Sequence, residues 1–319
     1  MKVYMAGFYS AHGAGTPNAM ISGISDPKFV LESYHYMDNR KAEAIRKLKK
    51  TIFLDSGAFS MFTQGVEVDL KAYAKYIEEN ADIIHVASNL DVIGRGNEQG
   101  SWDNQKELEG YGAVICPVHH ARDADYWLEK YLAEGYDYIF LGGMVPETTQ
   151  YLREWLDHVW GKFLTNPDGS AKVKVHGFGL TVLSLMLRYP WYSVDSTSWV
   201  MTSRYGSVYL DFPDGKRIKV DFSDQSTKQR EVNSWHYKVM RPDEQKIIRD
   251  RLAQLELTRA KNPEVEKLVF EATGMVQGYT PEALAAMYGW RDHLNIDFFN
   301  RLCSDDQTFF SQEQPKLFT

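Results

Sequence analysis

Short apolar, β-branched runs recur along the first two-thirds of the chain, and most end in Gly, Asp, Asn or His. Runs of this length and composition are typical of buried strands in a parallel sheet. Seven segments fit the pattern: KVYMAGF (2–8), TIFLDSGAF (51–59), DIIHVASNLD (82–91), AVICPVHH (113–120), YIFLGGM (138–144), VKVHGFGL (173–180) and WYSVDST (191–197).

Helical patterns lie between these runs, with apolar residues at three- and four-residue spacing over 68–81, 123–135 and 148–164. Strands that alternate with amphipathic helices indicate βαβ units. With an eighth strand expected after Asp195, the pattern predicts an α/β fold of the (β/α)₈ TIM-barrel type. An open doubly wound sheet is the alternative, but AGFYSAHGAG after the first strand lacks the spacing of a glycine-rich phosphate turn.

The last third of the chain has a different pattern. SVYLDFPDGKRIKVDF (207–222) predicts a β-hairpin, because two alternating runs flank a Pro-Asp-Gly turn. Helical segments follow, with Pro242 near a helix start, Gly274 at a helix end and Thr280-Pro281 opening the last helix. We expect a catalytic barrel domain over 1–235 that includes the hairpin, a helical part packed on it over 236–303, and a loosely ordered tail over 304–319.

The composition is that of a soluble globular protein, with 319 residues, 44% hydrophobic and 25% charged. No apolar run is long enough to span a bilayer, and we expect no membrane contact and no signal peptide. The two cysteines cannot build a disulfide framework or a multi-thiolate zinc site. This favours a cytoplasmic location, in the host cytoplasm if the source is viral. The net charge of −7 argues against a non-specific nucleic-acid coat protein.

Three aspartates, Asp55, Asp91 and Asp195, each end an apolar strand. In a barrel the carboxyl ends of the strands face one mouth, so these side chains are expected to converge there. A lone Asp in such a place is more often a helix N-cap, a strong alternative for Asp91 and a weaker one for the other two. Several carboxylates in one pocket indicate acid/base or covalent chemistry at a sugar carbon.

A metal site is disfavoured, because no carboxylate–histidine spacing of a catalytic zinc site is present. His119 and His120 are adjacent, so on a strand they point to opposite faces and at most one enters the pocket.

The strand ends resemble, in order, the motifs of the tRNA-guanine transglycosylases, TIM-barrel enzymes that exchange guanine for a 7-deazaguanine base. Arg204 and Gly206 before the hairpin also match the family pattern. Six short motifs in register over about half the chain are more specific than any one of them. Five of the six are the strand-end segments LDSGAF, NLD, LGGM, HGFG and YSVDS, and the sixth is the element with Arg204 and Gly206.

The departures from the family are informative. No cysteine lies between Cys116 and Cys303, so the family's three-cysteine-plus-histidine zinc motif is absent. His119 stands in place of a glutamine, His176 in place of a methionine, and Ala58 in place of a glycine. The sequence is therefore most similar to the zinc-less phage and bacterial branch that acts on DNA, which makes DNA the preferred partner and tRNA the alternative.

The resemblance implies a role for each residue at the strand ends. Asp195 would be the nucleophile at C1′ of a guanosine nucleotide and Asp55 the acid/base. Phe59 and His176 would sandwich the base, although barrel packing explains both nearly as well. No cofactor and no metal are implied. The residues expected to bind the 7-deazaguanine or guanine base also include Asp91, His119, Gly142, Gly143 and Ser56, and those expected to contact the phosphate backbone are Arg204, Lys216, Arg217 and Lys219.

Two other classes of function stay open from the sequence. One is a nucleoside hydrolase or deoxyribosyltransferase, which uses the same covalent chemistry with water or a small nucleoside as acceptor. The other is a non-catalytic partner subunit, which the presence of both aspartates disfavours. The resemblance also implies a homodimer, although no segment has the signature of an interface.

Overall fold

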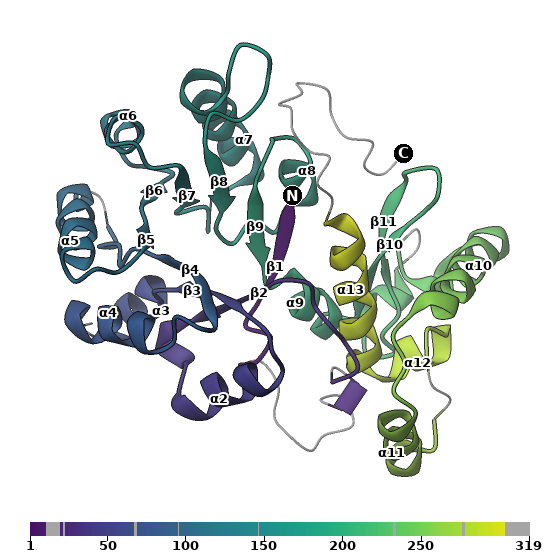
Figure 1. The fold of residues 1–319 in the computed structure, drawn as a ribbon. Coiled ribbons are helices and arrows are strands. Elements are labelled where there is room, and N and C mark those ends of the chain that lie inside the picture. The colour runs from purple at the N-terminus through teal and green to yellow at the C-terminus, as the bar shows by residue number, and fades with distance from the viewer. Residues whose placement is uncertain are drawn as a thin grey trace. The chain divides into compact units, whose positions relative to one another are not determined.

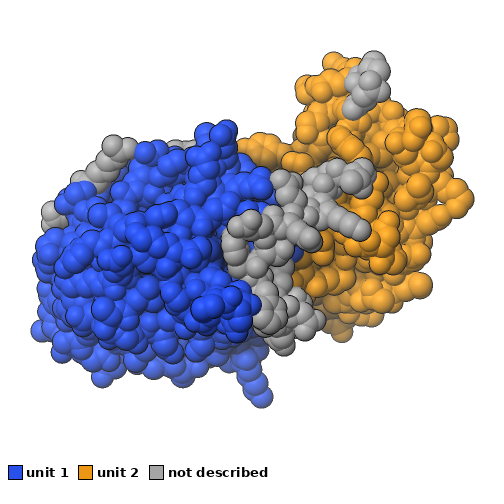
Figure 2. Space-filling view, turned by 90° about the horizontal axis from the view of Figure 1, so that it is seen from above, with its two compact units in different colours: residues 1–11, 29–196, 304–313 blue, residues 12–28, 197–303, 314–319 orange. Residues whose placement is uncertain are grey.

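The computed structural model describes residues 1–10, 20–21, 23–66, 69–94, 96–145, 147–231, 234–275 and 278–303. The chain divides into two compact units, coloured separately in Figure 2. In the described ranges, unit 1 holds 1–10 and 29–196, and unit 2 holds 20–28 and 197–303. Each unit is described by itself. The tail expected over 304–319 lies outside the described residues.

Unit 1 is a nearly closed, parallel, barrel-like sheet flanked by helices, a TIM-barrel-like fold (Figure 1). The hydrogen-bonded order is β5-β4-β3-β2-β1-β9-β8-β7-β6, and each of these strands runs parallel to the neighbours with which it pairs. The strands are β1 (Lys2–Ala6), β2 (Val30–Ser33), β3 (Ile52–Asp55), β4 (Ile84–Ser88), β5 (Ile115–Cys116), β6 (Val118–His120), β7 (Tyr138–Gly142), β8 (Lys174–Gly177) and β9 (Ser193–Ser196).

The near-closure depends on the segment over 115–120. Pro117 interrupts it, since proline has no N–H to donate to a sheet ladder. The part before Pro117, β5, pairs with β4, and the part after it, β6, pairs with β7. One interrupted strand therefore spans the two ends of the sheet.

One strand was assigned wrongly from the sequence. The eighth strand is β2, at Val30–Ser33, and it pairs with β1 and β3. The segment after Asp195 instead forms a helix and a two-stranded hairpin that is separate from the nine-stranded sheet. The sequence VLES is too short and too acidic to stand out as a buried strand, because Glu32 interrupts its apolar run.

In the described part of unit 1, seven α-helices connect the strands, and Figure 1 shows α4 to α7 on the outer side of the sheet. The three helices expected from periodicity are confirmed at α4, α6 and α7, and the last of them continues as a π-helix over Trp160–Leu164. The helices are α2 (Asn39–Lys47), α3 (Ala58–Gln64), α4 (Leu70–Glu79), α5 (Glu98–Gly110), α6 (Asp125–Ala133), α7 (Thr149–Val159) and α8 (Leu183–Met186).

Strand alternation separates two layers of packing in unit 1. One set of side chains meets inside the sheet, where Tyr4, Phe53 and Phe140 form a buried cluster. The opposite set packs under the helices, as Ile52 and Leu54 do with Ile45 and Tyr73. Because the side-chain period of a strand is two, Asp55 shares the interior face of β3 with Phe53.

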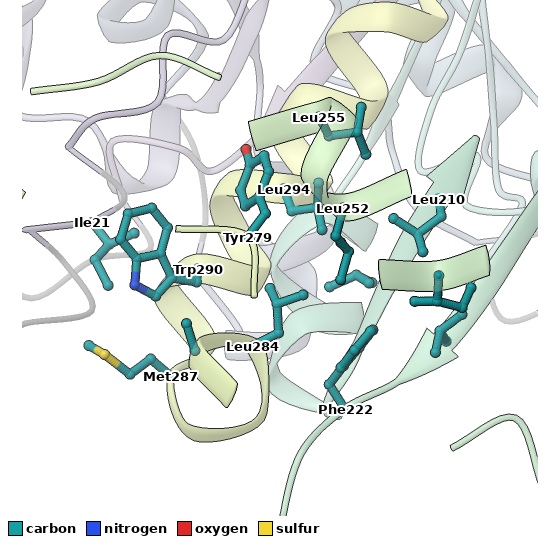
Figure 3. Close-up of a cluster of buried hydrophobic side chains, with 14 of the residues drawn as sticks. Ile21, Leu210, Phe222, Leu252, Leu255, Tyr279, Leu284, Met287, Trp290 and Leu294 are labelled. Atoms are coloured by element: carbon teal, nitrogen blue, oxygen red, sulfur yellow. The ribbon is translucent and has the colours of Figure 1, made fainter. Parts of the chain in front are cut away.

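Unit 2 contains the expected hairpin and the C-terminal helices in addition to residues 20–28. The hairpin therefore groups with the helices, and the division falls after Ser196 rather than at 235. The inner face of the hairpin, including Leu210 and Phe222, joins a core with Leu252, Leu284 and Trp290 (Figure 3). The elements are α9 (Ser198–Arg204), β10 (Ser207–Asp211), β11 (Arg217–Asp221), α10 (Pro242–Thr258), α11 (Pro263–Thr273), α12 (Pro281–Ala286) and α13 (Tyr288–Leu302).

Three helix boundaries predicted from the sequence of unit 2 are confirmed. Pro242 is the first residue of α10, and Gly274 ends α11 with φ of 65°. Thr280 caps α12 by accepting from the N–H of Ala283. The segment expected to form one last helix from Thr280 onward instead forms two helices, α12 and α13, which are separated at Met287. No helix in the described ranges is both long and apolar enough to cross a membrane.

Candidate active site

Asp195 lies on β9 with its carboxylate pointing into the interior of unit 1, and it is only 6% exposed. Its Oδ1 accepts from the N–H of Gly179 at 2.8 Å and lies 3.3 Å from Nε2 of His176. No hydrogen bond from the described part of the chain reaches Oδ2. Oδ1 is thus held in place, while Oδ2 is available for a bond to a substrate. The N-cap residue of α9 is Thr197 and not Asp195.

A chain of hydrogen bonds behind Asp195 fixes His176. Its Nδ1 lies 2.6 Å from the hydroxyl of Ser193, which lies 2.6 Å from the hydroxyl of Tyr138. Since the carboxylate can only accept, Nε2–H donates to it, and Nδ1 accepts from Ser193. Burial lowers the pKa of His176 despite the charge of Asp195, so the ring is neutral.

His176 is fully buried, and its ring contacts Phe53, Phe140 and Phe178. This arrangement agrees with barrel packing, the alternative to base stacking that the sequence allowed for His176. The ring orients the carboxylate of Asp195, and no face of it is open to a base in this structure.

Asp55 ends β3 on the same interior face. Its Oδ2 accepts from the N–H of Gly57 at 3.0 Å, and the hydroxyl of Ser88 lies 3.5 Å from Oδ1. Burial, and after it the charges of Asp91 and Asp195, raise the pKa of Asp55 to about 7. The three aspartates are therefore close enough to interact, and Asp55 can both give and take a proton near neutral pH.

The raised pKa predicts how Asp55 affects stability. The unfolded carboxyl ionises from about pH 4 upward, whereas the folded one keeps its proton to about pH 7. The free energy of unfolding should therefore fall as pH rises between these values and stay low above them. We expect Asp55→Asn to unfold at a higher temperature than the unsubstituted protein at pH 8, with the difference shrinking toward pH 4.

Thermal unfolding at a series of pH values measures this effect. Asp137→Asn is the matched control, because the side chain of Asp137 is 87% exposed. A gap between Asp55→Asn and the unsubstituted protein that is the same at pH 4 and pH 8 would show that Asp55 ionises normally.

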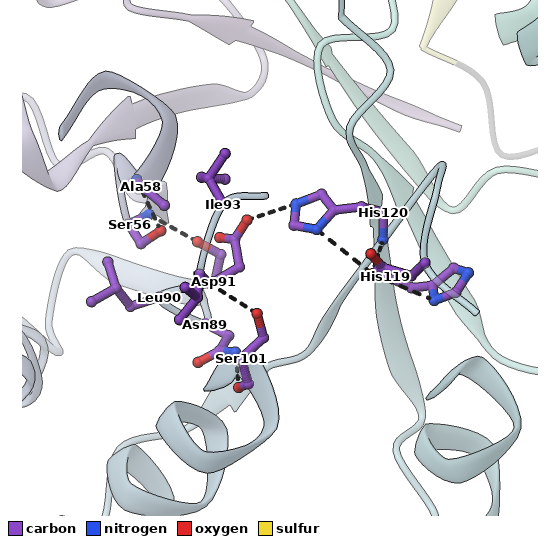
Figure 4. Close-up of polar contacts among 12 residues, drawn as sticks. Ser56, Ala58, Asn89, Leu90, Asp91, Ile93, Ser101, His119 and His120 are labelled. Carbon is purple, nitrogen blue, oxygen red and sulfur yellow. Dashed lines mark hydrogen bonds and ion pairs between the residues drawn. The ribbon is translucent and has the colours of Figure 1, made fainter. Parts of the chain in front are cut away.

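Asp91 follows β4 on a loop that is tied to α5. Asn89 donates to the carbonyl of Ser101 at 2.8 Å, and the Ser101 hydroxyl accepts from the N–H of Val92 at 2.9 Å (Figure 4). Asn104 donates to the carbonyl of Leu90 at 2.7 Å. These bonds hold the loop so that Asp91 points away from α5. The N-cap of α5 is Asn97, so the N-cap alternative for Asp91 is wrong.

The partner of Asp91 is His120, which the sequence did not single out as a site residue. Nε2 of His120 lies 2.6 Å from Oδ2 of Asp91, and Asp123 accepts from the His120 main-chain N–H at 2.8 Å. Burial acts to lower the pKa of His120, but Asp91 and then Asp123 outweigh it and the pKa is raised. The site therefore contains a partly buried ion pair that fixes the orientation of Asp91.

His119, the residue expected to bind the base, points the other way. Its ring stacks on Trp155 of α7 at 6.2 Å and is fully buried, and burial lowers its pKa to about 3. The expectation that His119 enters the site is not met. Side chains two residues apart on a strand lie on the same face, and Val118 lies with Phe140 in the interior cluster. The alternation along β6 therefore places His120, and not His119, on the interior face.

Gly142 and Gly143 border the ring of His120. A Cβ at Gly142 would lie 2.8 Å from Cδ2 of His120, and one at Gly143 would lie 3.0 Å from Cβ of His120. Gly143 also has φ of 67°, which other residues rarely adopt. The two glycines thus leave room for the imidazole beside Asp91, a role in addition to the expected contact with a base.

This close approach predicts that Gly142→Ala is destabilising. A methyl group forced against the His120 ring should cost about 1–3 kcal/mol of unfolding free energy and displace the ring from Asp91. Chemical denaturation measures the loss, and Gly161→Ala is the matched control, because a Cβ there meets no atom within 4 Å. In the double variant Gly142→Ala/His120→Ala most of the cost should disappear, and strictly additive losses would exclude the contact as the cause.

Ser56 and Phe59 follow Asp55. Ser56 is fully buried, and its N–H donates to the hydroxyl of Ser88 at 2.8 Å. Phe59 lies on α3 and is 60% exposed, so its ring is not enclosed in the interior in this structure. Ser88 was missed from the sequence, although its position two residues after the inward-facing Val86 places it on the interior face.

The basic residues expected on the nucleic-acid backbone all lie in unit 2. Arg204 ends α9, Lys216 precedes β11, and Arg217 and Lys219 lie on β11. Lys219 is exposed, and the other two on the hairpin are half-buried.

Within the ranges that the structure describes, no three His, Cys, Asp or Glu side chains gather closely enough to hold a metal ion.

No protein-family model matches the sequence, and no curated protein matches it significantly.

Proposed function

We propose that this chain is a base-exchange transglycosylase that replaces guanine in a nucleic acid with a 7-deazaguanine derivative, with Asp195 as nucleophile and Asp55 as acid/base. The observation that carries the proposal is the difference between the two interior carboxylates. Asp195 has one oxygen fixed by Gly179 and His176, whereas the pKa of Asp55 is raised to about 7. Two carboxyl groups in different environments are what covalent glycosyl transfer uses.

The proposed reaction has two symmetric halves. In the first, Oδ2 of Asp195 bonds to C1′, the bond from C1′ to the guanine nitrogen breaks, and Asp55 gives its proton to the departing base. In the second, the incoming deazaguanine gives a proton to Asp55, its nitrogen bonds to C1′, and the bond to Asp195 breaks. The proton that Asp55 loses in the first half returns in the second, which suits a group with a pKa near 7.

Asp91 is the residue proposed to recognise the base. Its Oδ2 is held by His120 at 2.6 Å, and no hydrogen bond from the described residues reaches Oδ1. A carboxylate oxygen accepts from an amide N–H or an exocyclic amine, the donors of a guanine edge. The main chain of Gly142 and Gly143 would complete the contact on the carbonyl side, where His119 was also expected, and His120 instead supports the site by holding Asp91.

DNA is the preferred acceptor and tRNA the alternative, on the resemblance to the zinc-less branch. A base inside a duplex cannot reach an interior site, so the target nucleotide has to be unpaired or flipped out. Phosphate contacts offset that cost, and Arg204, Lys216, Arg217 and Lys219 are proposed to supply them.

Labelled 7-deazaguanine tests the proposal when it is incubated with the protein and, separately, with duplex DNA, single-stranded DNA and tRNA. Incorporation into DNA supports the full proposal, and incorporation into tRNA alone overturns the preference for DNA. If no polymer receives label, the base-exchange reaction is excluded. Release of free guanine in that case would identify a hydrolase.

A further inference from the structure

Three aromatic side chains in the described part of unit 2 are more than half exposed, and two of them lie beside the hairpin, whereas the third, Phe270, lies on α11. Tyr205 is 74% exposed and Trp235 is 53% exposed. All eight tryptophans lie in the described ranges, and the other seven are buried or half-buried. An isolated exposed aromatic side chain is ordinary, but two that are anchored at one end of the same hairpin need an explanation.

Tyr205 and Trp235 flank this end of the hairpin. Gly206, next to Tyr205, accepts from the N–H of Phe222 at 2.8 Å. The carbonyl of Trp235 itself accepts from the N–H of Asp221 at 2.9 Å. A Cβ at Gly206 would lie 2.6 Å from Cβ of Ser223, so only glycine allows this approach. Main-chain bonds therefore anchor both residues to 221–223 and leave their rings on the surface.

The segment that carries both rings has a net charge opposite to that of the whole chain. The segment over 204–241 contains eight Lys and Arg against five Asp and Glu, whereas the chain as a whole has 36 against 43. The ammonium group of Lys228 lies 2.8 Å from the side chain of Asp221, the residue whose main-chain N–H donates to Trp235. Arg230 is exposed at the end of the same short helix, Thr227–Arg230.

We propose that Tyr205 and Trp235 form a stacking platform for the unpaired bases of a single-stranded polynucleotide, with Lys228 and Arg230 beside its phosphates. Every unpaired base has a face that stacks on an aromatic ring, whereas the bases of a duplex already stack on each other. Aromatic rings beside cations are the pattern of single-strand binding surfaces. The class of partner rests on the proposed function, in which the protein needs an unpaired strand at the target nucleotide.

The proposal predicts a loss of single-strand binding that is independent of catalysis. Fluorescence anisotropy with labelled oligodeoxynucleotides and oligoribonucleotides measures the affinity of the full chain. Tyr205→Ala and Trp235→Ala should each weaken single-strand binding by roughly 5- to 150-fold, as expected for one lost base stack. Trp235→Phe should keep most of the affinity. Arg230→Gln should lower the slope of affinity against salt by about one phosphate contact.

Tyr126→Ala is the matched control, because Tyr126 is 59% exposed on α6 of unit 1. Thermal unfolding of each variant verifies the fold. Unchanged single-strand affinity in both platform variants, or an equal loss in the control, would overturn the proposal. So would preference for duplex DNA. Single-strand binding is measured without 7-deazaguanine, so its result can be interpreted even if no label is incorporated. In the same way, a loss of the binding proposal leaves the result of the label experiment valid.

Discussion

Asp195→Asn is expected to abolish the covalent protein–nucleic-acid adduct and to lower base exchange by on the order of 10⁴-fold. Asparagine has the same shape and can keep the contacts that Oδ1 makes with Gly179 and His176. It replaces Oδ2, to which no described residue donates, with an amide that does not attack C1′. The fold should therefore survive while the chemistry is lost.

Electrophoresis under denaturing conditions, with a labelled guanine-containing strand, detects the adduct. Asp137→Asn, which changes an exposed carboxylate of the same unit, should form the adduct at the normal rate. An adduct that persists in Asp195→Asn would assign the nucleophile to another group. Loss of the adduct together with loss of the folded state would be recognised by the thermal unfolding curve.

Much of unit 1 could be predicted from sequence because its strands are buried on both faces. Such strands form continuous apolar runs that end abruptly, and the run that begins at Trp191 ends in this way at Asp195. The convergence of Asp55, Asp91 and Asp195 also follows from their places at strand ends, and the electrostatic coupling at Asp55 agrees with it.

The sequence predictions that were wrong concern features that depend on more than the local residue types. VLES at Val30–Ser33 pairs as a strand because its neighbours β1 and β3 supply partners on both sides, not because its own residues require it. The choice between His119 and His120 depends on strand register, which a shift of one residue inverts. The hairpin belongs with the C-terminal helices because its apolar face packs with Leu252 and Trp290, a long-range contact that no local pattern encodes.

The proton on Asp55 leads to the second large effect. If Asp55 protonates the departing base, the rate of guanine release should fall as pH rises through about 7, because the acid form is then lost. Asp55→Asn cannot give a proton, so we expect release to slow by about 10²- to 10⁴-fold and the fall above neutral pH to disappear. The measurement is kcat/KM for guanine release as a function of pH, which reports groups of the free protein.

A second substitution tests whether Asp55 is the group that causes the fall of kcat/KM above neutral pH. The charge of Asp91 is one of the two that raise the pKa of Asp55, so Asp91→Asn should move the fall to lower pH, whatever it does to affinity for the base. His120 should act in the opposite direction, because its charge offsets that of Asp91 at 2.6 Å, and His120→Gln should move the fall to higher pH. A fall that stays near pH 7 in Asp55→Asn would mean that another group carries the proton.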